Sequence, residues 1–511
     1  MPATFTSFYF LCFYAVSLLI YYIIPGKMQW GFLLFVSGAF YLLTGNGILI
    51  LYPIAAALIA YVSLRVMAGT EDVKKRRFAL FFAVVLLVGS LAVLKYVNFG
   101  INTVNGIAAL WGKGGDIVNP VRFLAPLGIS FYTLSILGYI VDVYNKIAEP
   151  QNNFFKLTLY GMYFPSILSG PILRYREDGE QFFIPHPFDY RQVTFGMQRM
   201  VWGFFKILVI SERMNLVVNT VYDNYTQYPG TYIWFATICF AFQLYTNFSG
   251  SMDIALGMSQ SFGIYLPENF ENPFFSKNIS EYWRRWHITL GVWMKEYVFY
   301  PLLRTGAFTS LGKKMRRKFG KKRGKQFSTF LAMFILWFMV GIWHGGDWKF
   351  VIGSGLLHWF YIVSGELLTP FFQKGMEKFH INPKGRWVDI FRMFRTFFLV
   401  NIGFVFFRAA SAMDAWKMLK GAVSVWNPWV LADGSLFSLG LDVIETVIAL
   451  VSLLILWTVS RLQKNGSVRE RIEKKKLPVR FVIWYALLFY IILLGYYGPG
   501  YSAAEFIYQG F

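Results

Sequence analysis

The sequence predicts an all-α polytopic membrane protein with about 11–13 transmembrane or re-entrant helices. Of its 511 residues, 56% are hydrophobic and 15% are charged, which is more apolar than is typical of a soluble domain. Apolar runs of about 18 residues or more recur along the chain, and each is long enough to cross a bilayer as a helix. The basic residues gather in short segments between these runs, as expected of cytoplasmic loops.

The formal net charge of +22 would suggest a nucleic-acid partner in a soluble protein. Here the placement of the basic residues between apolar runs favours contact with membrane lipid, and we expect no nucleic-acid partner. The two cysteines, Cys12 and Cys239, lie inside apolar runs and are too few for a disulfide framework or a thiolate metal site. We therefore expect neither a metal ion nor a tightly bound cofactor.

Residues 1–120 form the first of three predicted regions, a group of N-terminal transmembrane helices. The first apolar run lacks the charged leader and small-residue cleavage site of a signal peptide, so we expect a retained helix. Further spans are predicted at residues 31–43, 48–66 and 78–97. The basic cluster at residues 74–77 marks a cytoplasmic loop, which places the N-terminus outside and makes residues 98–120 an outer loop.

Residues 121–420 form the second predicted region, which contains possible re-entrant helices and the two histidine segments described below; the family resemblance given below implies that it is the catalytic core. Pro, Gly, Ser and Asp interrupt the helix-length apolar runs at residues 126–144 and 159–175. Broken helices that line a cavity and ordinary helix kinks both explain this pattern, and the sequence leaves both open. Spans resume at residues 193–210 and 232–258, the second of which carries the polar insertion QLYTNFSGSMD.

An aromatic helix is predicted at residues 281–300. Helical spacing places one stripe of apolar side chains on it, formed by Trp283, Trp286, Leu290, Trp293 and Tyr297. Arg284, Arg285 and Lys295 lie off this stripe, an arrangement that suits the membrane interface. His287 falls at its margin, where interfacial hydrogen bonding and a catalytic role are both possible.

The segment at residues 304–325 contains many Lys and Arg residues and no acidic one. It is predicted to be a cytoplasmic loop that contacts anionic lipid. A second interpretation is that it collects a polyanionic ligand, such as the phosphates of coenzyme A. Charge alone does not decide between them.

A plain hydrophobic span follows at residues 327–342, and Trp337, Gly341 and His344 share one face of it. Gly345 and Gly346 are expected to end this helix, and Asp347 to cap a new one that begins at Trp348. A titratable side chain at a helix break in the apolar region is costly to desolvate, which makes His344 a candidate functional residue. The carbonyl end of the helix would favour its protonated form, as a proton-accepting group needs. A purely structural histidine is the alternative.

His358, inside the next apolar run, lacks such a break and is predicted to be a satisfied interhelical hydrogen bonder. The remaining spans are expected at residues 350–368, 391–407, 443–459 and 481–495. Residues 421–511 form the third region, with C-terminal transmembrane helices and an aromatic tail. The basic segment at residues 461–480 is predicted to be cytoplasmic, which would leave the C-terminus outside.

Three segments together resemble the membrane-bound O-acyltransferase family. They are WRRWHITLGVWMKEYVFYPL, the later GIWHGGDW and the upstream PLGISFYTLSILGYIVDVY. Within the family they are similar to the bacterial branch of alginate O-acetylation proteins and the teichoic acid D-alanyl transfer protein. The resemblance covers most of the chain from about residue 121, and it implies a ring of transmembrane helices around a thin central tunnel. The tail SAAEFIYQGF is similar to the aromatic tail of the family, although Gly510 departs from its pattern.

The resemblance implies that His344, of the WHG motif, is the catalytic residue and that His287 is a second functional one near the cytoplasmic side. The resulting hypothesis is an enzyme that moves an acyl group across the membrane for O-acetylation of a cell-surface or exported polysaccharide, such as alginate. We expect acetyl from cytoplasmic acetyl-CoA as the donor substrate. His344 would act as general base or orient the thioester, and His287 would position donor or acceptor. The expected donor-binding or acceptor-binding residues are Arg284, Arg285, Trp286, Trp343 and Lys295.

The expected location is the cytoplasmic (inner) membrane of a bacterium, which the chain crosses many times. A separate extracytoplasmic acyltransferase is expected as a partner, because the chain offers no large soluble domain and no Ser-His-Asp arrangement. Two other functions fit the sequence. One is D-alanyl transfer from a carrier protein toward teichoic acids. The other is a proton-coupled transporter or flippase whose histidines relay protons.

Overall fold

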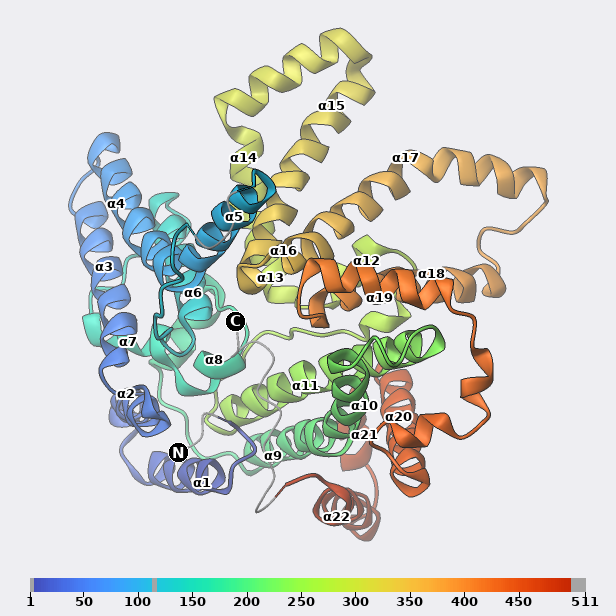
Figure 1. Cartoon of the computed structure of the whole chain (residues 1–511). Helices are drawn as coiled ribbons and strands as arrows, with labels where there is room; N and C mark the ends of the chain where they lie inside the picture. Colours follow the sequence, from blue (N-terminus) through green and yellow to red (C-terminus); the bar gives the residue numbers. More distant parts are fainter. Residues whose placement is uncertain (1–3, 113–116, 498–511) are drawn as a thin grey trace. The chain divides into compact units, whose positions relative to one another are not determined.

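The protein was analysed as a computed structural model that describes residues 4–112 and 117–497. Within these residues every regular element is a helix, and the only strand-like pairing is an isolated bridge between Phe270 and Trp286 (Figure 1). The all-α class predicted from the sequence is therefore confirmed. The aromatic tail and its Gly510 lie outside the described residues.

Eight helical segments of the described chain are long and apolar enough to cross a membrane. They are Gly26–Gly45, Gly47–Ala68, Val73–Leu110, Gly306–Gly345, Trp348–Lys378, Arg386–Arg408, Val443–Gln463 and Leu477–Leu494. Two further apolar helices, Phe8–Ile23 and Ile129–Tyr144, are shorter. These segments confirm a multi-pass membrane protein.

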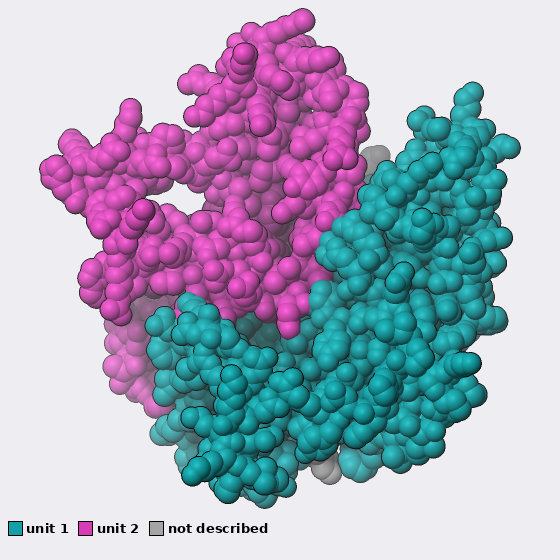
Figure 2. Space-filling model, turned by 180° about the vertical axis from the view of Figure 1, so that it is seen from behind, with its two compact units in different colours: residues 1–215, 242–267, 442–511 teal, residues 216–241, 268–441 magenta. Residues whose placement is uncertain are grey.

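The chain forms two compact units, drawn in teal and magenta in Figure 2. The first contains Met1–Asn215, Phe242–Pro267 and Asp442–Phe511, and the second contains Leu216–Ala241 and Glu268–Leu441. Both candidate histidines belong to the second unit. The three regions predicted from the sequence, residues 1–120, 121–420 and 421–511, were not defined by compactness. They stay a prediction beside these two units.

The first unit opens with four helices close to their predicted positions, α1 Phe8–Ile23, α2 Gln29–Tyr41, α3 Leu51–Ala68 and α4 Val73–Leu91. The predicted outer loop at residues 98–120 is wrong over its first half, where α5 runs from Val97 to Leu110. The polar residues of this stretch do not break the helix. Asn105 instead uses its side chain to bind the backbone of the following segment, at Ile117 and Val118.

The two interrupted runs of the sequence behave differently. The first forms an unbroken helix, α6 Ile129–Tyr144. The second is broken at Tyr163 into α7 Phe154–Met162 and α8 Phe164–Ser169, and an extended segment follows. A proline in the first turn of α8 explains the break, because proline lacks the backbone N–H that would bond to the preceding turn and its ring clashes with the carbonyl four residues earlier.

A long helix, α11 Thr231–Ser261, carries the polar insertion predicted inside an apolar run. Its Asp253 pairs with Arg199 of α9, at 2.9 Å, and with Lys206 of the following π-helical segment η7. The partly buried carboxylate is thus compensated by two cations of the same unit. The other helices of the unit are α9 Tyr190–Phe204, η7 Phe205–Ser211, α10 Glu212–Asp223 in part, α20 Val443–Gln463, α21 Val468–Glu473 and α22 Leu477–Leu494.

The second unit is built around α15 Gly306–Gly345 and the segments packed on it. Before α15 come α12 Ile279–Arg285, α13 Ile288–Met294, η9 Lys295–Phe299 and α14 Tyr300–Arg304. After α15 come α16 Trp348–Phe350, η10 Val351–Leu356, α17 Leu357–Lys378, α18 Arg386–Arg408 and α19 Ala412–Ser424. The single aromatic helix predicted at residues 281–300 is therefore wrong, because the chain breaks between α12 and α13.

The basic segment predicted as a loop is helical. It forms the first arm of α15 and the start of the second, and the chain reverses at Gly320, whose φ is +80°. The arms meet through small residues, because a Cβ on Gly324 would collide with the backbone of Arg316. Figure 1 shows this hairpin at the top of the view. Its Lys and Arg side chains are largely exposed, which leaves them accessible to anionic lipid or to an anionic ligand.

Candidate functional site

His344 lies in the last turn of α15 and its side chain is 2% exposed. The helix ends as predicted, with Gly346 in the left-handed region at φ +55°. Asp347 then caps α16 by accepting a hydrogen bond from the backbone N–H of Lys349 at 2.8 Å. The helix break around this histidine is confirmed, and the Gly-Gly-Asp sequence explains it.

Close packing holds the end of α15 against η10. Trp337, Gly341 and His344 are all buried, as their shared face predicted. A Cβ on Gly341 would lie 2.6 Å from the Cα of Val351, so the two backbones touch at this point. The π-helical turn of η10 brings Ser354 to the imidazole of His344.

The hydrogen bonds of His344 determine where its proton sits. Its Nδ1 lies 2.8 Å from the carbonyl oxygen of Val340 and 3.2 Å from Ser354 Oγ. A carbonyl oxygen can only accept, so Nδ1 must carry the proton. The Ser354 hydroxyl donates to the Phe350 carbonyl at 2.7 Å and can accept from the same Nδ1–H. In the neutral ring Nε2 then keeps its lone pair, as a general base requires.

His287 lies at the break between α12 and α13 and is fully buried, at 0% exposure. It therefore lies in the interior of the protein and not on its surface, and its depth in the membrane stays a prediction. Its backbone is left-handed, with φ +48°, so the chain leaves one helix and starts the next at this residue. The aromatic stripe gave no indication of this, because it assumed a continuous helix.

Asn269 stabilises the break. Its Oδ1 accepts from the backbone N–H and the hydroxyl of Thr289, each at 3.0 Å, which identifies this atom as the amide oxygen. The same oxygen lies 3.3 Å from His287 Nδ1, so Nδ1 is the donor here as well. The backbone carbonyl of Asn269 also accepts from Ile288, at 3.1 Å. Both histidines are thus held in one tautomer, with the lone pair on Nε2.

Trp343 lies between the two histidines. The centroid of its ring is 5.4 Å from that of His287 and 5.2 Å from that of His344. The ring of Phe407, from α18, contacts His344 edge-on at 5.8 Å. The structure therefore brings together three of the predicted site residues, His287, Trp343 and His344, in a buried apolar setting.

The other four predicted site residues take different positions. The ring of Trp286 packs on Phe270 and Phe404, with centroids 5.0 Å and 6.1 Å away. Arg285 forms an ion pair with Glu281 at 2.7 Å. Arg284 and Lys295 have exposed side chains. A role in binding donor or acceptor stays a prediction for all four.

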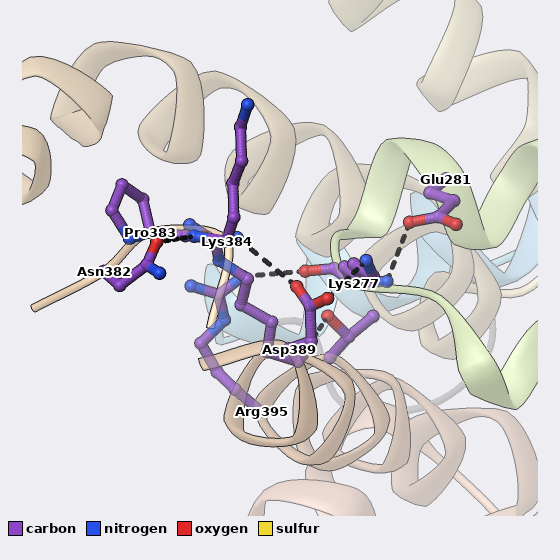
Figure 3. A network of polar contacts seen from close by, with 9 residues as sticks. Lys277, Glu281, Asn382, Pro383, Lys384, Asp389 and Arg395 are labelled. Carbon is purple, nitrogen blue, oxygen red and sulfur yellow. Dashed lines mark hydrogen bonds and ion pairs between the residues drawn. The ribbon is translucent and has the colours of Figure 1, made fainter. Parts of the chain in front are cut away.

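A polar network secures the start of α12, which leads to His287 (Figure 3). The backbone N–H of Lys277 donates to Glu281 at 2.8 Å, and its ammonium pairs with Asp389 of α18 at 2.7 Å. Arg395, also of α18, donates to the carbonyl of Lys277 at 3.1 Å. These contacts join α12 to α18, the helix that also supplies Phe407.

Sequence reasoning missed Asn269 and Ser354. Asn269 lies in a loop 18 residues before His287, and Ser354 lies ten residues after His344 in a π-helical turn. Neither lies on the same helix as its histidine, so no helical pattern in the sequence could have found them. The prediction for His358 is also wrong, because its buried Nδ1 has no hydrogen-bond partner among the described residues.

Comparison with known proteins matches this chain to one family. The sequence profile of the membrane-bound O-acyltransferase (MBOAT) family covers residues 149–399. The chain is 30% identical to a protein named probable alginate O-acetylase AlgI of Pseudomonas putida, over 77% of this chain and 74% of the relative. It is 29% identical to the peptidoglycan O-acetyltransferase of Helicobacter pylori, over 71% and 68%. It is 29% identical to the teichoic acid D-alanyltransferase of Bacillus subtilis, over 56% and 70%.

Proposed function

Since this chain belongs to the membrane-bound O-acyltransferase family and is an O-acyltransferase, we propose that it acts in O-acetylation of a cell-surface or exported polysaccharide. The reaction moves an acetyl group across the cytoplasmic membrane of a bacterium. Relatives named as alginate and peptidoglycan acetylating enzymes support this class of acceptor.

The observation that carries the proposal is the geometry of His344. A buried imidazole with its Nδ1 proton held by the Val340 carbonyl offers the Nε2 lone pair to a substrate. Position and tautomer are both set before a substrate arrives. Such preorganisation is what a general base in an apolar site requires.

The proposed reaction is a simple acyl transfer. His344 Nε2 accepts the proton of the attacking hydroxyl while the hydroxyl oxygen bonds to the thioester carbonyl carbon. The C–S bond then breaks, and the departing thiolate takes the proton back from the imidazolium. The products are an O-acyl ester and a free thiol, and no other reagent is consumed. Orientation of the thioester, rather than proton transfer, is the alternative role of this histidine.

His287 and Trp343 complete the proposed site. The Nε2 of His287 can accept a hydrogen bond from a group of the donor or acceptor, because Asn269 occupies its Nδ1. The indole ring of Trp343 touches both imidazoles and limits where a substrate can lie. Neither histidine is free to rotate without losing a hydrogen bond.

The proposed donor is acetyl-CoA, used as a substrate from the cytoplasm. We place the exposed Lys and Arg side chains of the α15 hairpin on the cytoplasmic side, because the positive-inside rule favours that position. They also suit a polyanionic donor or anionic lipid. We further propose the ring of 11–13 helices around a tunnel that the family resemblance implies, and delivery by a separate extracytoplasmic acyltransferase.

D-Alanyl transfer from a carrier protein toward teichoic acids is the second candidate. The relative from Bacillus subtilis supports it. Purified protein supplied with acetyl-CoA or with a D-alanyl carrier protein separates the two, because only the true donor should lose its acyl group. The transporter or flippase considered from the sequence is set aside, because the chain belongs to an acyltransferase family.

The central experiment replaces His344 by Ala in a deletion strain, with mass analysis of the surface polysaccharide. We expect O-acetylation to be lost while the membrane level of the protein stays normal. A matched control is His380→Asn, which changes an exposed loop histidine at φ +52°, a backbone conformation that asparagine tolerates. Normal acetylation in the His344→Ala strain would refute the proposal.

A further inference from the structure

The chain between α18 and α20 joins two candidate membrane spans, Arg386–Arg408 and Val443–Gln463. It therefore leaves and re-enters the membrane on one side. Its longest element is α19, which begins at Ala412, shortly after the end of α18. A helix that follows a span so closely lies near the membrane surface, so the side chains on its exposed face are within reach of lipid headgroups.

One face of α19 is buried in the second unit. Its buried residues recur at helical spacing: Ala415, Met418 and Ala422. The carbonyl of Ala422 accepts a hydrogen bond from Nε1 of Trp234, at 3.1 Å, which ties the end of α19 to α11. The helix is thus packed on the unit through this face, and its opposite face is exposed.

The exposed face of α19 is also apolar. Met413, Trp416 and Val423 follow helical spacing on it and are 62%, 63% and 78% exposed. Lys417 and Lys420 lie beside them and are exposed as well. A surface helix in water normally carries polar residues on its outer face. The exposed apolar row therefore indicates contact with something other than water.

The loop after α19 adds two exposed tryptophans, Trp426 and Trp429, at 82% and 60%. Asn427 fixes this loop from below. Its Oδ1 accepts from the backbone N–H of Thr231 at 2.7 Å, and its Nδ2 donates to the carbonyl of Pro229 at 3.1 Å. The loop is thus held to the start of α11, and the two indole rings face outward from an ordered backbone.

We call Met413, Trp416, Val423, Trp426 and Trp429 the tryptophan surface. Tryptophan is enriched where a membrane meets water, because its ring is apolar and its N–H can bond to headgroups or water. Lysine beside such rings extends its ammonium group to lipid phosphates. The composition of this surface and its place in the chain between two spans both match a lipid headgroup layer.

We propose that the tryptophan surface lies in the headgroup layer of the lipid bilayer, with the ammonium groups of Lys417 and Lys420 on lipid phosphates. Three candidate spans separate it from the basic hairpin along the chain: the second arm of α15, residues 348–378 and α18. An odd number of crossings places it in the leaflet opposite the hairpin. This inference does not depend on the proposed acyl transfer.

The tryptophan surface is connected to the helix break of the candidate site. Nζ of Lys349, in α16, donates at 2.8 Å to the carbonyl of Ala409, in the short connection between α18 and α19. The helix α16 begins directly after the Gly-Gly-Asp sequence that follows His344. Attachment of α19 to the headgroup layer therefore limits how far the end of α15 can move along the membrane normal.

The test uses single spin labels on the full-length protein in nanodiscs of phosphatidylethanolamine and phosphatidylglycerol. Cys12→Ser and Cys239→Ala first remove both native thiols. Val423→Cys and Trp426→Cys then each provide one labelling site, and both replaced side chains are exposed, so the fold should be kept. Collision rates with oxygen, which concentrates in lipid, and with a water-soluble nickel chelate report the depth of each label.

Two reference sites bracket the result. Leu450→Cys places a label on an exposed position of the span α20, and Glu71→Cys places one on the exposed turn before α4. We expect the labels at positions 423 and 426 to collide with the nickel chelate several-fold less often than the label at position 71, and with oxygen more often. Nickel collisions as frequent as at position 71 would overturn the proposal. Protection from both reagents would overturn it too, because it would show that protein covers the surface.

A second variant tests the tryptophans themselves. Trp416→Ser combined with Trp429→Ser should raise nickel collisions at position 423, because the neighbouring rings no longer hold the surface in lipid. Trp387→Ser is the matched control, since Trp387 is 81% exposed at the start of α18 and lies outside the tryptophan surface. Unchanged collisions at position 423 in the double variant would contradict the proposal. No acyl donor is needed, so the result holds whether or not the proposed reaction is correct.

Discussion

The two histidine regions of the candidate site are built in different ways. His344 follows local rules, because its Nδ1 binds the carbonyl of Val340 one turn earlier and a Gly-Gly-Asp sequence ends its helix. His287 depends on Asn269, which is 18 residues away in the sequence. The helix break next to His344 could be predicted from its own residues, and the helix break at His287 could not. The comparison shows that a helix break stabilised by a loop far away in the sequence cannot be recognised from the residues of the helix alone.

The largest effect is expected from replacing His344 by Gln, which keeps a polar side chain but cannot act as a base. General-base catalysis is typically worth about 10²–10⁴ in rate, so kcat should fall by about that factor. Protein stability should change little, because an amide can still donate to the Val340 carbonyl. Single-turnover acetyl transfer measures the rate, and a rate within about twofold of wild type would assign the histidine a structural role.

Asn269→Ala should give the next largest effect. It removes the common acceptor of His287 and Thr289, and breaking such a buried network typically costs about 1–3 kcal/mol of stability. We expect lower thermal stability together with a clear loss of acyl transfer, because His287 loses its fixed orientation. Asn382→Ala is the control, since that side chain binds only the nearby N–H of Lys384 on an exposed turn. Equal losses of thermal stability and acyl transfer in the two variants would argue against a special role for Asn269.

Ser354→Ala tests the local region and should have a smaller effect on activity. The Val340 carbonyl still holds the proton on Nδ1, so we expect kcat to fall only a few-fold. Ser364→Ala is the matched control, because the same hydroxyl-to-carbonyl bond spans one helical turn there without an imidazole. Acyl-transfer rates of the two variants provide the comparison. A loss as large as that of the His344→Gln variant would show that Ser354 is needed to hold the imidazole.

Gly346→Ala is expected to have the smallest effect on activity. The residue ends α15 in the left-handed region, where a side chain costs about 1 kcal/mol. Thermal stability should fall slightly and acyl transfer should stay near normal. Gly365→Ala, in the exposed middle of α17 with open space at its Cβ, should instead raise stability. A drop in thermal stability in both variants would show that the destabilisation is not specific to the end of α15.

Much of the fold could be predicted because bilayer-length apolar runs and caps are local signals. The end of a helix at Gly345 and Gly346 and the start of the next one after Asp347 were predicted correctly. The interruption at His287 could not be, because the pairing that creates it joins Ile288 to the distant backbone of Asn269. The helical form of the basic segment was also missed. Charge density suggested a loop, yet close packing at Gly324 makes a hairpin.

The hairpin has a mechanical consequence for the site. The second arm of α15 continues from the turn at Gly320 to Gly345 without another departure from helical backbone. An α-helix is stiff along its axis, since each residue is hydrogen-bonded to the turn before it. A displacement of the basic end of this arm would therefore be carried to His344 along one continuous helix. The basic end of α15 and the imidazole of His344 are thus mechanically connected by a single helix.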